Sequence, residues 1–317
     1  MAKNTISIQT RDRYRRVVVN LRKQAAYKYN KMPEQITIPL LCRHLIERHP
    51  FISASTWRSY RAAIFHVYGY GMERSVLNIL NQIPGGGKKP NLTPYGARQK
   101  MKSFPDLMLN ETLRYLSTHQ TKIGNALWLW LSVGIETGLR PFEWYDAEII
   151  SLNHSLHLKV KNAKNTNGRA NGPYRHLNLD QVDPTTLGFI RAHLQVIQAI
   201  KISAGGHEAI GHKKYNTYYS SCRRRLKVVV RRLWPDRDKY PSLYSLRHQF
   251  IANAKADGFT LEEIAAMCGQ ASADTPSIHY GRKQNGTQGR VSVRPKKDEV
   301  LSVRKSSDFH HRNAANR

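Results

Sequence analysis

A run of glycines, prolines and lysines at positions 84–90 constrains the fold of this chain more than any other feature. Pro84-Gly85-Gly86-Gly87-Lys88-Lys89-Pro90 cannot continue a helix, and its lysines keep it solvated. We therefore predict a helical domain over residues 1–87, a linker over 88–103 and a second domain over 104–285. The polar, basic and Gly-rich end, residues 286–317, is predicted to be a mobile tail.

The charge of the chain points to a polyanionic partner. Lys and Arg number 51 and Asp and Glu 22, which gives a formal net charge of +29 over 317 residues. The hydrophobic content of 40% is that of a globular protein and excludes a mainly disordered one. Nucleic acid is the simplest partner, and a generic basic protein such as a ribosomal one is the alternative.

Other classes of protein find no support in the sequence. Cys42, Cys222 and Cys268 form neither a metal-ligand spacing nor a disulfide framework, as expected in a reducing cytoplasm. Residues 1–11 are polar and basic, without the hydrophobic core of a signal peptide. The most apolar run, residues 126–135, is too short to cross a bilayer. We expect no metal site and no membrane segment.

Apolar periodicity predicts a mainly α fold with a small β-hairpin. In the first domain we expect helices over Arg11–Tyr29, over Pro39–His49 and around Trp57. Arg58 and Arg61 on the third of these contact DNA phosphates or, equally, form an ordinary solvated face.

The second domain is predicted to pack around one buried helix. Residues 124–137 are apolar on all sides, which is typical of a central helix. Residues 156–161 alternate in polarity and predict a strand, which a polar loop joins to a returning strand at 175–179. Further helices are expected over 105–118, 183–204, 217–233 and 245–257, and after the capping box that starts at Thr260.

Three short motifs carry the candidate chemistry. In Thr137-Gly138-Leu139-Arg140-Pro141-Phe142-Glu143, we expect Arg140 at a junction between two helices, oriented by Glu143 for phosphate recognition. A structural Arg–Glu pair is the alternative. The second motif, Tyr244-Ser245-Leu246-Arg247-His248, is predicted to set Arg247 at a helix start. The third runs from Cys268-Gly269-Gln270 to Tyr280. Each motif by itself is typical of ordinary structural residues.

In this order and spacing, the three motifs resemble the catalytic domain of tyrosine recombinases, the integrase family. That family shows a Thr-Gly-Leu-Arg-x-x-Glu motif, a lysine in a β-hairpin, a Leu-Arg-His box, a Leu-Gly-His/Trp motif and then a nucleophilic tyrosine. The resemblance covers Phe104 to Arg282 well and the N-terminal segment loosely.

The resemblance implies a role for each matching residue. Arg140 and Arg247 match the two catalytic arginines, and Glu143 matches the support of the first. Tyr280 matches the nucleophile. Lys164 is the best match for the hairpin lysine, with Lys161 as the fallback.

The sequence departs from the family at two positions. Tyr244 stands where members usually carry His or Lys, and Gln270 where they carry His or Trp. Both side chains can hydrogen-bond a phosphate oxygen, but neither shuttles protons near neutral pH as histidine does. His248 lies nearby in sequence, although not at the family's usual position.

The resemblance implies a two-domain enzyme that cuts and rejoins double-stranded DNA through a 3′-phosphotyrosine link, without metal or cofactor. It further implies a homotetramer on paired sites, in the bacterial cytoplasm, that integrates or excises a mobile element. A catalytically impaired DNA-binding protein on the same fold is the runner-up. A type IB topoisomerase or a telomere resolvase would share the chemistry. In the linker, Lys88 and Lys89 are expected to join Arg58 and Arg61 in binding DNA.

The charge generates a first prediction. With a net charge of +29, the chain should neutralise many phosphates, and binding should release their counterions. DNA affinity should fall by roughly 10³-fold or more between about 50 and about 200 mM salt. Fluorescence anisotropy on labelled duplex measures this, and an affinity that stays flat across the titration would contradict it.

Overall fold

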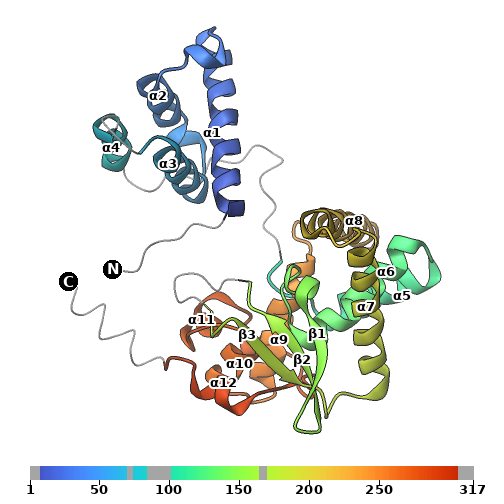
Figure 1. Cartoon of the computed structure of the whole chain (residues 1–317). Helices are drawn as coiled ribbons and strands as arrows, with labels where there is room; N and C mark the ends of the chain where they lie inside the picture. The colour runs from blue at the N-terminus through green and yellow to red at the C-terminus, as the bar shows by residue number, and fades with distance from the viewer. Residues whose placement is uncertain (1–7, 70–73, 84–100, 164–169, 306–317) are drawn as a thin grey trace. The chain divides into compact units, whose positions relative to one another are not determined.

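The chain forms two compact units, residues 1–98 and 99–317 (Figure 1). The computed structural model describes residues 8–69, 74–83, 101–163 and 170–305. Lys88, Lys89 and Lys164 lie outside these residues. Within the described ranges the fold is mainly helical with one small sheet, as predicted. No helix of those ranges is long and apolar enough to cross a membrane.

Unit 1 is a small helical bundle. Its helices are α1 (Ile8–Tyr29), α2 (Ile38–Arg48), α3 (Ala54–Tyr68) and α4 (Arg74–Gln82), with 3-10 turns at Pro33–Gln35 and His49–Phe51. The Ser53 hydroxyl caps α3 by accepting a hydrogen bond from the Thr56 amide at 3.1 Å. The core is built from apolar side chains of all four helices, among them Leu21, Leu41, Leu45, Trp57, Ile64, Leu77 and Leu80.

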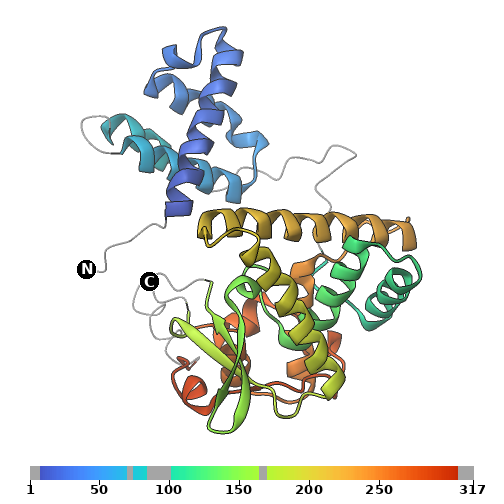
Figure 2. The same cartoon turned by 45° about the vertical axis from the view of Figure 1, so that its right-hand side comes forward.

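Unit 2 is organised around α6 (Lys122–Thr137), as its uniform apolarity predicted. This helix packs against four others: α5 (Asp106–Thr118), α7 (Pro184–Ile202), α8 (Glu208–Leu233) and α9 (Leu243–Ala256). The longest of them, α8, starts well before the predicted residue 217 and crosses one side of the unit (Figure 2). Half of the 16 residues of α6 are buried, and removing their apolar surface from water stabilises this core.

A four-stranded antiparallel sheet lies against these helices in the order β1-β2-β3-β4. The predicted hairpin is β2 (Ser155–Lys161) with β3 (Tyr174–Asn178), in a register that pairs Val160 with Arg175. Two strands were not expected, β1 (Glu148–Leu152) and β4 (Arg294–Pro295). β1 turns into β2 through Asn153 and His154, whose φ angles of 49° and 64° suit a tight hairpin turn.

The C-terminal region corrects the predicted mobile tail. After α10 (Leu261–Met267), α11 (Asp274–His279) and a 3-10 turn at Lys283–Asn285, the chain adds β4 to the sheet and forms α12 (Lys297–Leu301). Val291 and Val293 are buried, and Val303 packs on Ala265 and Ala266 of α10. The prediction was wrong for residues 286–305 because three separated valines in a basic segment form no recognisable apolar pattern.

Candidate active site

Arg140 is held by the way α6 ends. Gly138 ends the helix at φ 63°, and a Cβ there would meet the Phe250 ring at 2.3 Å, so only glycine fits. The chain then enters a 3-10 turn, Glu143–Asp146, rather than the second helix that was expected. The Tyr215 hydroxyl donates a hydrogen bond to the Pro141 carbonyl and fixes this turn.

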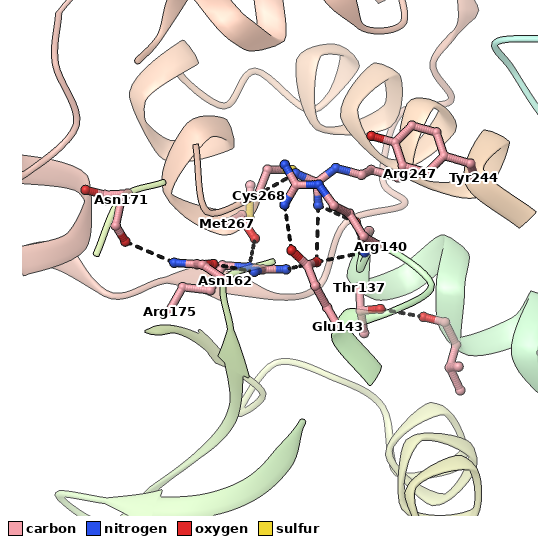
Figure 3. Close-up of polar contacts among 12 residues, drawn as sticks. Thr137, Arg140, Glu143, Asn162, Asn171, Arg175, Tyr244, Arg247, Met267 and Cys268 are labelled. Carbon is pink, nitrogen blue, oxygen red and sulfur yellow. Dashed lines mark hydrogen bonds and ion pairs between the residues drawn. The ribbon is translucent and has the colours of Figure 1, made fainter. Parts of the chain in front are cut away.

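The Glu143 carboxylate is the centre of a buried charge network (Figure 3). Its Oε2 accepts from the Arg140 amide at 2.8 Å and its Oε1 from Arg140 Nη1 at 2.5 Å, which fixes backbone and guanidinium together. Arg247 Nη1 lies 3.7 Å from Oε2. The predicted Arg140–Glu143 pair is present, and it is part of a larger cluster.

Arg175 is the member of the cluster that sequence reasoning missed. It lies on β3 with 1% of its surface exposed, and its Nη2 donates to Glu143 Oε2 at 2.7 Å. Its position carried a signal: in a strand, Arg175 shares a face with Leu177 and Leu179, and that face is buried. An arginine on the core face of a strand requires a buried acid as a partner.

Arg247 is also fully buried, but not at a helix start as predicted. It lies in the second turn of α9 and reaches two neighbouring segments. Nη1 donates to the Gly138 carbonyl at 2.9 Å and Nη2 to the Cys268 carbonyl at 2.6 Å. The side chain thereby joins the end of α6 to the end of α10, which brings the first and third motifs together.

Tyr280 lies beside Arg247, as the motif order required. The Arg247 guanidinium carbon is 5.6 Å from the centre of the Tyr280 ring. The Tyr280 hydroxyl is 3.0 Å from that of Tyr244, and the His248 ring centre is 4.7 Å from the Tyr280 ring centre. Segments around residues 140, 247 and 280 thus meet in one basic cluster, in which both arginines are buried and Tyr280 is partly exposed.

Burial and charge shift the pKa values of the titratable groups in this cluster in different directions. Burial alone would raise the pKa of Glu143, but Arg175, Arg247 and Arg140 together hold that pKa well below its ordinary value. Burial opposes ionisation of Tyr280 as well, yet Arg247, a hydrogen bond from Tyr244 and Arg140 bring its pKa below the ordinary value.

Two neighbours of Tyr280 shift in ways that keep them neutral. The pKa of Tyr244 is raised, first by burial and also because it donates to Tyr280. Burial and the nearby Lys102 and Arg247 lower the pKa of His248 to about 4. Tyr280 is therefore the hydroxyl of this pair that ionises first, and His248 is uncharged at neutral pH.

The remaining predicted residues differ in how they are bound. Gln270 is 2% exposed, and neither its side-chain oxygen nor its nitrogen has a partner among the described residues. Lys161, the fallback for the hairpin lysine, is largely exposed and pairs loosely with Asp146 at 3.7 Å. Arg58 is exposed on α3, and Arg61 is half-buried there.

The sequence matches no protein-family model and no curated protein. Solved structures with a similar course of chain are recombinases. XerH site-specific recombinase bound to its difH substrate, in a pre-cleavage complex, has a TM-score of 0.45 at 14% identity, covering 90% of this chain and 89% of that one. Its post-cleavage complex on palindromic difH scores 0.43 at 13%, covering 82% and 80%. XerA recombinase scores 0.36 at 17%, covering 98% and 93%.

The network generates a prediction about stability and pH. Glu143→Gln leaves buried arginines without their carboxylate, and breaking such a pair costs about 3–5 kcal/mol. Because the folded pKa of Glu143 is depressed, its contribution is complete above the unfolded pKa of about 4.3 and is lost as the pH falls toward the folded value. Urea unfolding at neutral pH and at about pH 3 measures both effects.

The matched control is Glu148→Gln, which breaks an exposed ion pair with Lys159. It should change stability by less than about 1 kcal/mol. The difference in the free energy of unfolding between the unchanged protein and Glu143→Gln should be smaller at about pH 3 than at neutral pH. A difference of constant size at both pH values would contradict the assignment of the charge to Glu143.

Proposed function

We propose that this chain is a site-specific DNA recombinase of the tyrosine recombinase family, which cleaves and rejoins DNA through a 3′-phosphotyrosine. The observation that carries the proposal is the convergence of Arg140, Arg247 and Tyr280 in one basic cluster, with the tyrosine pKa lowered. The arginines also hold the fold together around Glu143, but a structural role does not require a tyrosine of lowered pKa beside them.

The reaction follows from the chemistry of these groups. The Tyr280 hydroxyl gives its proton to solvent water, its oxygen bonds to the phosphorus, and the bond between phosphorus and the 5′-oxygen breaks. Arg140 and Arg247 hold the non-bridging oxygens and stabilise the charge that develops there. Lys164, which lies outside the described residues, gives a proton to the departing 5′-oxygen. A 5′-hydroxyl of another strand reverses the steps and releases Tyr280.

Gln270 supports a phosphate ligand at this site. A buried amide without any hydrogen bond costs about 1–3 kcal/mol, and its nitrogen can donate to a phosphate oxygen. Arg140 and Arg247 each leave Nε without a partner as well. Unsatisfied donors on both arginines and on Gln270, two residues after the Cys268 carbonyl that Arg247 binds, fit an anion that arrives with the substrate.

We propose that the phosphate at this site belongs to duplex DNA. Helix α8 carries a row of exposed basic side chains that can contact phosphates: Lys213, Lys214, Arg223, Arg224, Lys227, Arg231 and Arg232. We propose that Arg58 and Arg61 of unit 1, with Lys88 and Lys89, also bind DNA phosphates. We further propose that four copies assemble on two paired sites in the bacterial cytoplasm and that a mobile element is integrated or excised.

One observation favours a second candidate, a catalytically impaired DNA-binding protein on the same fold. Tyr244 occupies a position where the family usually carries His or Lys, and Gln270 one where it carries His or Trp, while His248 is uncharged at neutral pH. Covalent trapping on DNA separates the two functions, because only the enzyme forms a bond.

The proposal predicts that Tyr280→Phe abolishes covalent attachment to a nicked duplex, by more than about 10³-fold, since it removes only the nucleophilic oxygen. Binding to DNA should stay within about threefold. Denaturing gels detect the adduct, and mass spectrometry of the DNA-linked peptide identifies the residue. Tyr240→Phe is the matched control, because its hydroxyl bonds only the Trp234 and Pro235 carbonyls. An adduct on another residue would refute the assignment.

A further prediction concerns pH. Tyr244→Phe removes the hydroxyl that donates to Tyr280, so the pKa of Tyr280 should rise. The rate of adduct formation rises with pH until Tyr280 is ionised, and in Tyr244→Phe that rise should move to higher pH. A profile that loses amplitude at every pH without moving would mean that Tyr244 acts on the phosphate and not on the nucleophile.

A further inference from the structure

Arg175 binds three chain segments with one guanidinium. Besides Glu143, it donates from Nη1 to Asn162 Oδ1 at 2.6 Å and from Nε to the Met267 carbonyl at 2.8 Å (Figure 3). Glu143 belongs to the turn that carries Arg140, Asn162 follows the end of β2, and Met267 ends α10. All three bonds are buried, so none is weakened by competition with water.

We infer that Arg175 is a positioning residue, which sets Asn162, directly after β2, and the Gly269-Gln270 turn against the Arg140–Glu143 pair. The inference rests on the proposed function, because it concerns the groups that act there on DNA. A charge partner for Glu143 alone would need one bond, whereas this side chain uses every edge of its planar fork.

Asn162 extends this hold to the loop. Its amide donates to the Pro173 carbonyl at 2.9 Å, and Nδ2 donates to the carbonyls of Asn171 and Gly172, each at 3.0 Å. The two ends of the loop are thereby closed by one side chain whose oxygen is fixed by Arg175. Lys164 follows Asn162 by two residues in the sequence, so we expect a substitution that frees Asn162 to act on Lys164 as well.

Gly269 provides independent geometric support. It adopts φ +59°, and a Cβ at this position would lie 2.0 Å from Asn162 Oδ1 and 3.0 Å from Arg175 Nη1. The turn that presents Gln270 therefore packs directly on the Asn162–Arg175 pair. A side chain at residue 269 would have to displace one of the two.

Adduct formation by the full chain on a nicked duplex tests the inference, with an ordinary phosphodiester and with sulfur in place of the bridging 5′-oxygen. A sulfur leaving group needs no proton. The sulfur substrate should therefore restore the rate of a variant in which only Lys164, the proposed proton donor, is misplaced. Asn162→Ala should react about 10²-fold slower on ordinary DNA, as misplacement of a catalytic group does, and should recover most of that loss on the sulfur substrate. Arg175→Lys should be slow on both substrates and recover partly, because Arg140 and Glu143 also lose support.

Leu177→Ala is the matched control, since it removes a fully buried side chain from the same strand without touching the network. It should lower the melting temperature while keeping the sulfur-to-oxygen rate ratio of the unchanged protein. If Asn162→Ala and Arg175→Lys keep that ratio too, their role is merely structural and the inference is wrong.

A second measurement holds even if the unchanged protein forms no adduct, a result that would refute the proposed function alone. Gly269→Ala, Arg175→Lys and the double variant are compared by melting temperature. The two shifts should not add, because both substitutions disrupt the same contact. Additive shifts would show that the turn and Arg175 are independent and would overturn the inference.

Discussion

The Glu143 carboxylate is the interaction on which the rest of unit 2 depends. It is fully buried and pairs with Arg140 and Arg175, with Arg247 close by. These arginines come from the end of α6, from β3 and from α9. One carboxylate therefore joins three elements that are far apart in the sequence. A charge in the interior is tolerated only when it is paired and hydrogen-bonded, and here the requirement sets the arrangement of the motifs.

The same network leaves a surplus of charge. Three guanidinium groups face one carboxylate, so the cluster has two positive charges more than it can neutralise internally. Arg140 and Arg247 each keep an Nε without a partner among the described residues. The side-chain amide of Gln270, two residues after the Cys268 that Arg247 binds, also has none. Buried donors without acceptors are costly, and in the proposed function a bound phosphodiester would supply the missing acceptors.

Much of this could be predicted from sequence, and the exceptions have physical reasons. α6 and its break at Gly138 were predictable because apolarity on all sides and a glycine stop are local signals. The pairing of Arg140 with Glu143 followed from their spacing. Arg175 was missed because it is one of 51 basic residues, and only its strand face distinguishes it from a solvated arginine. β4 and α12 were not predicted because β4 is stabilised by pairing with β3 and α12 by packing on α10, and both partners are far away in the sequence.

The pairing of Tyr244 with Tyr280 shows how the surroundings of two adjacent hydroxyls decide which of them ionises first. Two hydroxyls 3.0 Å apart cannot both ionise readily, since the first phenolate is stabilised by the proton that the second retains. The environment decides which one ionises. Burial opposes both, whereas the charges of Arg247 and Arg140, with the hydrogen bond from Tyr244, bring only the pKa of Tyr280 below its ordinary value. A histidine at residue 244 would add another group that can carry positive charge to a cluster that already has a surplus. A tyrosine there supplies the hydrogen bond without that charge, and the lowered pKa of Tyr280 then depends on the arginines as well as on that bond.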